Sequence, residues 1–134
     1  MLIRFVRILI YLWTFPTTSV GLIFLAPTRL GRVHARVFAG VIEIHGGLAT
    51  WFLRHATLLE GGASAMTLGH VVIGVDEQAL DLTRDHERVH VRQAERLGPF
   101  FIPAYLLASF LAWRRGLDPY RDNPFEIEAY NLAG

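Results

Sequence analysis

The longest feature in the pattern of hydrophobic and polar positions is an uncharged run near the amino terminus, from Ile8 to Ala26. At ~1.5 Å per helical residue this run comes close to crossing a ~30 Å hydrocarbon core. Arg4 and Arg7 precede it, and no small-x-small cleavage site follows it, which favours a membrane anchor over a cleaved signal peptide. We therefore predict a single-pass transmembrane helix over residues 1–27, and arginines on both sides leave its orientation open.

Shorter, strand-like pieces separated by glycines follow the expected anchor. Residues 40–45 alternate in part and end at a Gly-Gly pair, and residues 65–75 contain a β-branched run, so we expect a strand in each. Segment 48–59 fits the helix and strand periods equally well. No internal repeat or clear linker divides the rest of the chain, so residues 37–134 are expected to form one domain with a small sheet.

A long amphipathic helix is predicted from Asp81 to Leu97, because Asp81 or Thr83 can cap its start and Gly98-Pro99 can stop it. Its inward stripe at helical spacing consists of Leu82, His86, Val89, His90, Gln93 and Leu97. Two histidines and a glutamine thus lie where an unpartnered polar group costs about 1 to 3 kcal/mol. One metal ion would satisfy both imidazoles, whereas without a metal each imidazole would need its own hydrogen-bond partner.

The residues from His86 to His90 spell the pattern H-E-x-x-H within this helix. Residues four positions apart lie on the same face, so the two imidazoles can bind a single Zn²⁺. Glu87 then lies beside the metal and can act on its water. The chain has no cysteine, so thiolate ligands are excluded and any metal is held by histidine and carboxylate.

Zinc bound in this way needs a third protein ligand. A metzincin would have a glycine and a further histidine at the positions of Gln93 and Arg96, so that class is excluded. The remaining source is a carboxylate from a later helix. Residues 123–130 offer Glu126 and Glu128 at an expected helix start, where a proline suits the first turn.

On these residues the chain resembles the gluzincins, the HExxH metallopeptidases whose third zinc ligand is a downstream glutamate. It is most similar to compact, single-domain members with an E-x-E-A signature. The resemblance implies a minimal zincin-like domain in which His86, His90 and Glu126 bind Zn²⁺ and Glu87 is the catalytic base. Where the family often carries an aspartate four residues after the ligand glutamate, this chain has Tyr130.

A second uncharged segment runs from Gly98 to Trp113. Its length corresponds to about 24 Å of helix, which is short for a membrane span. If it crossed the bilayer once, Glu126 would lie on the opposite side from the motif histidines, so we expect a buried or membrane-dipping helix. The predicted fold is therefore α+β, with an N-terminal transmembrane helix, a small sheet, the HExxH helix and C-terminal helices.

A hydrolytic site also needs a hydrogen-bond donor for the oxyanion and a surface that holds the substrate. The donor candidates, among which the sequence does not choose, are His70, Tyr120, Arg121 and Tyr130. The run Gly69–Val75 is a candidate edge strand for pairing with an extended substrate, and equally a plain core strand.

Composition narrows the functional classes further. Hydrophobic residues make up 52% of the chain and charged residues 19%, a balance that favours membrane contact. The net charge of +1 gives no electrostatic basis for binding nucleic acid. We expect a membrane-anchored zinc metallopeptidase with a peptide or protein substrate, and its oligomeric state stays open. The alternatives are an inactive zincin-fold binding or scaffold module, and a two-span membrane protein whose HExxH is accidental.

Overall fold

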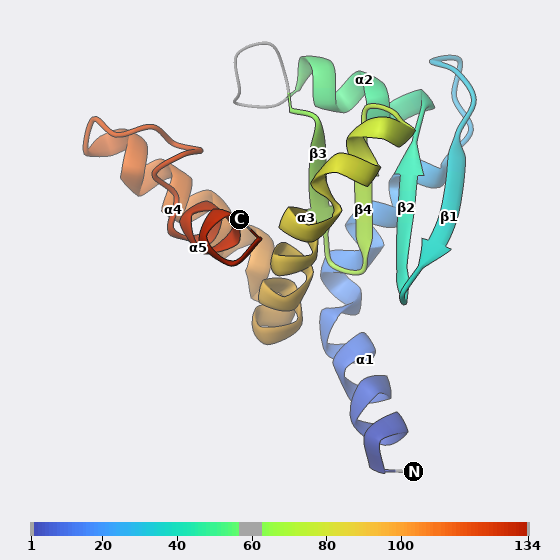
Figure 1. The fold of residues 1–134 in the computed structure, drawn as a ribbon, viewed down its shortest axis with the longest axis horizontal. Coiled ribbons are helices and arrows are strands. Elements are labelled where there is room, and N and C mark those ends of the chain that lie inside the picture. The colour runs from blue at the N-terminus through green and yellow to red at the C-terminus, as the bar shows by residue number, and fades with distance from the viewer. Residues whose placement is uncertain (1, 57–62, 134) are drawn as a thin grey trace.

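A computed structural model describes residues 2–56 and 63–133 of the chain. Figure 1 shows a sheet with α3 against one face, α1 and α2 toward the other, and an arm formed by α4 and α5. In chain order the elements are α1 (Leu2–Leu22), η1 (Ile23–Leu25), β1 (His34–Phe38), β2 (Val41–His45), α2 (Gly47–His55), β3 (Ala65–Leu68), β4 (Val71–Gly74), α3 (Glu77–Leu97), η2 (Gly98–Phe100), α4 (Phe101–Arg114) and α5 (Pro124–Ala133). The predicted α+β class is confirmed.

The sheet has the strand order β1-β2-β4-β3, in which β2 and β4 are parallel and the two outer pairs are antiparallel. The strand predicted over residues 40–45 is confirmed as β2. The single strand predicted over 65–75 is wrong, because Gly69 adopts a φ of +69° and turns the chain into a β3–β4 hairpin. The run Gly69–Val75, a candidate edge strand from the sequence, contains the inner strand β4. The edge strand on that side of the sheet is β3.

Two regions of the sequence pattern gave no firm expectation of secondary structure. The ambiguous segment 48–59 is helical as far as His55, within α2, and its remainder lies partly outside the described residues. Strand β1 was not predicted, because all five of its residues are exposed and no apolar alternation marks it.

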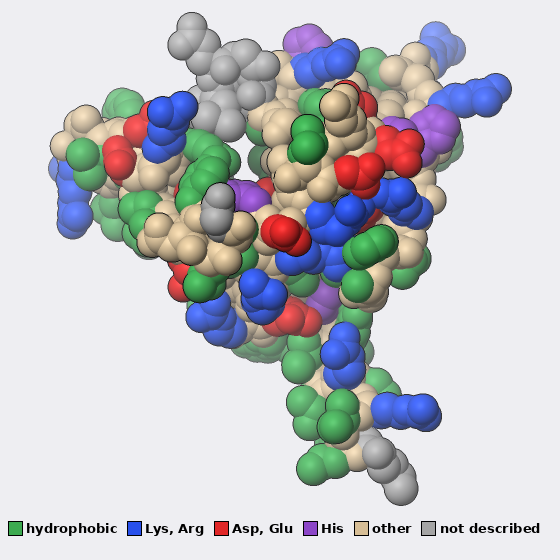
Figure 2. Space-filling model, viewed as in Figure 1, with side chains coloured by type: hydrophobic (Ala, Val, Ile, Leu, Met, Phe, Trp, Pro, Cys, Tyr) green, Lys and Arg blue, Asp and Glu red, His purple; other side chains and the backbone are tan. Residues whose placement is uncertain are grey.

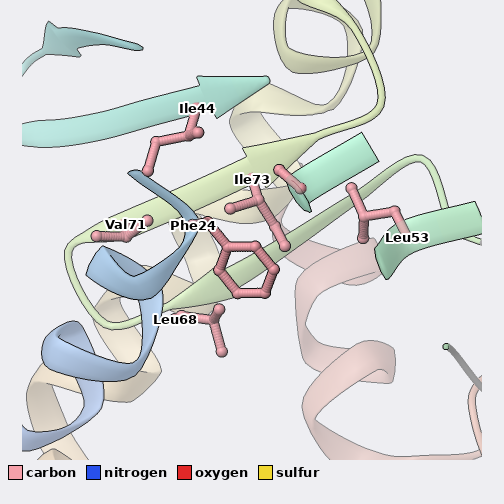
Figure 3. Close-up of a cluster of buried hydrophobic side chains, with 7 residues drawn as sticks. Phe24, Ile44, Leu53, Leu68, Val71 and Ile73 are labelled. Carbon is pink, nitrogen blue, oxygen red and sulfur yellow. The ribbon is translucent and has the colours of Figure 1, made fainter. Parts of the chain in front are cut away.

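The side chains of β2 and β4 alternate between two apolar clusters, one on each face of the sheet. The larger cluster, in Figure 3, contains Phe24, Ile44, Ala49, Leu53, Leu68, Val71 and Ile73. It joins β2, β3 and β4 to α2 and η1. On the opposite face Val41 and Val72 pack with Leu80 and Val91 of α3. Helix α3 is therefore fixed against the sheet by its own apolar residues.

Helix α3 begins earlier than predicted, and one of its residues faces the wrong way. Asp76 is the N-cap, with Oδ1 accepting from Ala79 N at 2.7 Å, so capping by Asp81 or Thr83 is wrong. Leu82 was expected to face inward but is 77% exposed. The first turns of α3 direct Ala79 and Leu80 toward the sheet instead, which leaves Leu82 on the solvent side.

Helix α1 turns small and polar residues inward and apolar residues outward. Its buried residues are Thr14, Thr17, Thr18 and Gly21. Thr17 Oγ1 donates to the Gly98 carbonyl at 2.7 Å, and Thr18 Oγ1 accepts from His70 N at 3.0 Å. A Cβ on Gly21 would lie 2.6 Å from Val71 Cβ, so only glycine permits this approach to β4. Packing through small residues is typical of helices in membranes.

Two helical runs are long and apolar enough to cross a membrane, Leu2–Leu25 and Glu77–Arg114. The apolar part of the second run is α4, whose 14 residues span about 21 Å. After α4 the chain returns, and Glu126 of α5 lies beside His86 of α3. A bilayer between α3 and α5 is incompatible with this contact.

A buried ion cluster joins β2 to α3. The Glu43 side chain is 1% exposed, and its two oxygens accept from Arg84 at 2.9 Å each. Arg88 donates to the same carboxylate at 3.1 Å, and Arg36 at 3.3 Å. Burial by itself raises the pKa of Glu43, but the hydrogen bonds from Arg84 and Arg88 outweigh it and lower the pKa below its ordinary value.

We expect Glu43 to make the stability of the fold depend on acid pH. The unfolded pKa of a glutamate is about 4.3, and the folded value is lower. The stabilisation is therefore fully present at neutral pH and is lost as the pH falls from about 4.3 through the folded pKa. Urea unfolding of the wild type should show this loss, whereas Glu43→Gln should be less stable by about 3 kcal/mol at pH 7 and depend less on pH. Parallel pH profiles would contradict this assignment.

Candidate metal centre

Helices α3 and α5 bring two imidazoles and one carboxylate to a common point. His86 Nε2 lies 2.9 Å from Glu126 Oε1, and His90 Nε2 lies 3.0 Å from the same oxygen. His90 and Glu126 are buried, at 4% and 3% exposed. Ligand atoms of His86, Glu87 and His90 also lie within 4.8 Å of one another, close enough to hold a metal ion. Residues forty positions apart in the sequence thus form one cluster.

Glu126 is positioned by the way in which α5 begins. Asn123 is fully buried and its Oδ1 accepts from Phe125 N at 2.9 Å, in the manner of a helix cap. The Asn123 amide donates to the Tyr105 carbonyl at 3.1 Å and to Ser109 Oγ at 2.9 Å. Because these bonds join the first turn of α5 to α4, the arm holds Glu126 in a fixed place over α3. The helix start expected at the proline is confirmed.

The two glutamates of α5 have different surroundings. Glu126 Oε1 faces Nε2 of both motif histidines, and Oε2 accepts from the Tyr105 hydroxyl at 2.5 Å. Glu128 is partly exposed and accepts from Gln93 and Arg96, each at 3.0 Å. Of the two candidates that the sequence offered, Glu126 lies against the imidazoles.

The hydrogen bonds of Gln93 assign the proton of His90. Gln93 Nε2 donates to the Phe125 carbonyl and to Glu128 Oε1, each at 3.0 Å. These two bonds turn the amide oxygen toward His90 Nδ1, 2.8 Å away. An amide oxygen only accepts, so His90 Nδ1 carries a proton, and in the neutral ring Nε2 presents a lone pair. A lone pair on Nε2 then faces Glu126 Oε1 at 3.0 Å, and either a metal ion or a proton that makes His90 an imidazolium satisfies both atoms.

The three facing atoms match the donor set of zinc, and two of their three separations are close to the spacing of zinc ligands. Two ligand atoms bound tetrahedrally at ~2.0–2.1 Å are about 3.3 Å apart. The observed separations of His86 and His90 Nε2 from Glu126 Oε1 are 2.9 and 3.0 Å. Side-chain shifts of a few tenths of an ångström would therefore accommodate the ion. Two imidazoles and one carboxylate are the ligands of a three-residue zinc site that keeps a fourth position open.

The pKa shifts of the cluster follow from the close approach of the two imidazoles to the Glu126 carboxylate. Burial by itself raises the pKa of Glu126, but hydrogen bonds from His86 and His90 outweigh it and lower the pKa to about 2. Burial lowers the pKa of His90, but the hydrogen bond to Glu126 and the charge of Glu87 outweigh it and raise the pKa. Glu126 is therefore ionised at neutral pH, as a metal ligand must be.

Glu87 lies beside the three facing atoms without bonding to Glu126. It is 5% exposed, and Thr67 Oγ1 donates to its Oε1 at 3.1 Å. Its other oxygen is 3.8 Å from His86 Nε2. Burial raises the pKa of Glu87, and the motif histidines oppose that rise only in part. A buried carboxylate with a raised pKa at this distance has the properties of a general base.

We expect Gln93→Leu to weaken zinc binding by about ten- to a hundredfold, because leucine removes the acceptor that keeps the proton on His90 Nδ1. Competition with a chromophoric chelator measures the affinity, and circular dichroism checks the fold. Gln78, on an exposed turn of the same helix, supplies the matched control Gln78→Leu. Equal affinities in all three proteins would show that Gln93 does not orient the imidazole.

Two of the predicted oxyanion donors lie away from the cluster. His70 Nε2 is 2.9 Å from Glu95 Oε2, and its ring stacks on Tyr11 at 4.0 Å between centroids. Its neighbours thus come from α1 and the outer side of α3. Arg121 is exposed in the turn before α5, where its backbone N–H donates to Asp118 at 2.8 Å.

The other two candidates, both tyrosines, lie at the cluster. The Tyr130 ring packs on the His86 ring at 4.4 Å between centroids, so an aromatic ring stands where the gluzincin resemblance would place a carboxylate. The Tyr120 hydroxyl lies 3.0 Å from the Tyr130 hydroxyl. Tyr120 also lines the same cavity as Glu87. Of the four candidates, Tyr120 is the one that lines this cavity.

Three residues of the site had no place in the sequence prediction: Thr67, Tyr105 and Asn123. Tyr105 and Ser109 carry the two hydroxyl groups of the uncharged run 98–113 and are four residues apart, a spacing that marks one helix face. Asn123 directly precedes the proline, which is a helix-cap signal. Nothing local to Thr67 indicates its contact with Glu87, because that contact depends on how β3 crosses α3.

A cavity of about 340 Å³ adjoins the cluster and is lined by Glu87, His90 and Glu126 together with residues of β3 and α4. Figure 2 shows the surface hollowed between the α4–α5 arm and the rest of the molecule, with a histidine side chain at the edge of the hollow. The site therefore has room for a ligand beside its polar groups.

Comparison with protein-family models, with curated proteins and with solved structures finds no match for this chain. Any functional assignment therefore depends on the residues and geometry of the site. Ligand atoms of His86, Glu87 and His90 lie close enough together to hold a metal ion, and the Glu126 carboxylate lies against both imidazoles. The buried carboxylate of Glu87 also lines the adjoining cavity.

Proposed function

We propose that the protein is a membrane-associated, zinc-dependent peptidase with a zincin-like site. One observation carries the proposal: Glu126 Oε1 lies 2.9 Å from His86 Nε2 and 3.0 Å from His90 Nε2. The proton that Gln93 holds on His90 Nδ1 supports it, since it leaves Nε2 as a ligand. The pattern of α3 supports hydrolysis, because a base adjoins the ligands in sequence and in space.

The reaction divides among the residues of the cluster as follows. His86, His90 and Glu126 would hold the zinc ion, which would supply Lewis-acid polarisation of the substrate carbonyl and activation of water near neutral pH. Glu87 accepts the proton of the attacking water and passes it to the leaving amine. The hydroxyl of Thr67 holds the Glu87 carboxylate in position. Tyr120 is the candidate donor to the oxyanion.

A peptide substrate is favoured by the free edge of β3. Val75 N donates to Ser64 O at 3.0 Å, so in the antiparallel ladder the main-chain groups of Ala65 and Thr67 point away from β4. Residues of this edge line the cavity that contains Glu87 and His90. An extended peptide that pairs with β3 would therefore place its backbone next to the catalytic groups.

The membrane part of the proposal depends on α1. Apart from Arg4 and Arg7 near its start, the exposed residues of α1 are apolar, and they include Leu9, Leu12, Phe15 and Val20. Exposure of such an apolar surface is unfavourable in water and favourable in the hydrocarbon core of a bilayer. The inward face of threonines packs on η2 and the β3–β4 turn, so the helix holds the domain directly at the membrane.

Zinc-dependent cleavage of peptides tests the proposed function. The full chain, purified in lipid nanodiscs, is stripped with a chelator, divided, and one half is reloaded with one equivalent of zinc. Each half is incubated with a mixed peptide library, and mass spectrometry identifies the products. We expect cleavage by the reloaded protein only. Equal product patterns with and without zinc, or no products in either, would contradict the proposal.

A further inference from the structure

The cavity beside the cluster has polar groups at one end and apolar walls elsewhere. Its polar end is formed by Glu87, His90 and Glu126. The apolar walls come from α1, α2, β3 and α4 and include Val20, Phe52, Met66, Phe101, Ile102 and Leu106. Within the described residues, no charged side chain lines the cavity outside that polar end.

The few polar side chains in these walls already have partners. Thr67 donates to Glu87, and Tyr105 donates to Glu126. Ser109 Oγ accepts from the Asn123 amide at 2.9 Å. The walls therefore provide few hydrogen-bond partners to replace the water that a charged or strongly polar substrate group would lose on entry. An apolar group has no hydrogen bonds to water to lose, and its burial is favourable in free energy.

The cavity walls continue into the exposed apolar surface of two helices. Val20 of α1 and Leu106 of α4 both line the cavity, yet they are 41% and 55% exposed. On α4 the neighbouring Leu107, Phe110 and Leu111 are exposed as well. Among the described residues that line the cavity, those of α1 and α4 are uncharged, so an apolar ligand that enters from the outer faces of these helices would meet no charged side chain of theirs before the polar end.

We propose that the cavity takes an apolar, extended polypeptide segment that arrives from the bilayer past α1 and α4. This inference rests on the proposed peptidase function and adds its substrate class. A polypeptide is favoured over an alkyl chain because the wall includes Ala65 and Thr67, whose main-chain groups point away from β4 and have no backbone partner among residues 2–56 and 63–133. An alkyl chain would leave these groups without partners. The scissile bond then lies beside His90 and Glu87.

Binding and cleavage of two dansylated peptides of equal length test this proposal. One peptide is rich in leucine and alanine, and the other has serine and glutamine at the same positions. The full-length protein is used in nanodiscs with zinc, as Glu87→Gln for binding by fluorescence anisotropy and as wild type for cleavage by mass spectrometry. We expect the apolar peptide to bind at least about tenfold more tightly than the polar one.

Two neighbouring leucines of α4 provide a matched pair of variants. Leu106 lines the cavity and is 55% exposed, whereas Leu107 is 57% exposed and does not line it. Placed in the same Glu87→Gln background, Leu106→Trp should reduce binding of the apolar peptide about tenfold by filling the cavity. Leu107→Trp should leave binding unchanged, because it adds the same bulk to the outer face.

The outcomes separate this proposal from the peptidase function. Equal binding of both peptides, or equal effects of Leu106→Trp and Leu107→Trp, overturns the apolar-segment proposal, and zinc-dependent cleavage of both peptides would leave the peptidase function standing. Selective binding of the apolar peptide without cleavage supports the cavity proposal and contradicts the peptidase function. Displacement of the peptide by an equal concentration of dodecanoate would assign the cavity to an alkyl chain and overturn the proposal.

Discussion

Glu87→Gln is expected to lower peptide hydrolysis by roughly a hundred- to ten-thousandfold while leaving zinc binding intact. Glutamine keeps the size of the side chain and can still accept from Thr67, which donates to Oε1 at 3.1 Å. It cannot take up a proton from water, so the step assigned to Glu87 is lost. The measurement compares initial cleavage rates and zinc content of the two proteins under the same conditions.

Asp85→Asn is the matched control for this substitution. Asp85 is an exposed carboxylate two positions earlier on α3, so its replacement makes the same change of charge without touching the cluster. We expect its cleavage rate and zinc content to equal those of the wild type. If Glu87→Gln also cleaved at the wild-type rate, Glu87 would not be the base. A protein that binds zinc and cleaves nothing would instead be the inactive scaffold module that the sequence left open.

Glu126→Gln is expected to reduce zinc affinity by more than about a hundredfold. Partners that only orient a ligand are worth about ten- to a hundredfold in affinity, and loss of a direct ligand exceeds that. Removal of the Glu126 charge also leaves His86 and His90 without the carboxylate that both contact at 2.9 and 3.0 Å. Zinc affinity is measured by competition with a chelator, on protein whose fold is checked by circular dichroism.

Glu128→Gln supplies the internal comparison, since it lies two residues away on the same helix. Its carboxylate contacts Gln93 and Arg96 rather than the two imidazoles. We expect it to retain most of the zinc affinity, with a small decrease through Gln93. If Glu128→Gln lost zinc and Glu126→Gln retained it, the ligand assignment in α5 would be reversed.

The sequence predicts the cluster well where a single helix carries the information. The spacing of His86 and His90 places both imidazoles on one side of α3 whatever the rest of the chain does. The position of Glu126 is not fixed by a local pattern, because it depends on α5 folding back across α3. The Asn-Pro start of α5 marks the helix, but the contact itself arises from Tyr105 and Asn123, which join α5 to α4.

Errors in the prediction have physical causes in tertiary packing. Leu82 fits the helical stripe of the motif, yet it is exposed because α3 turns Leu80 toward the sheet in its first turns. The β3–β4 hairpin looked like one strand, since its turn at Gly69 interrupts the β-branched run only briefly. The exposed strand β1 gave no apolar signal at all. In each case, contacts between elements decided what the local pattern left ambiguous.

The central claim, a zinc ion held by His86, His90 and Glu126, is tested most directly by anomalous X-ray diffraction at the zinc edge on crystals of the zinc-loaded protein. We predict one anomalous peak about 2.0 to 2.2 Å from His86 Nε2, His90 Nε2 and Glu126 Oε1. A peak at other residues, or none at these three in crystals loaded with an equivalent of zinc, would contradict the claim.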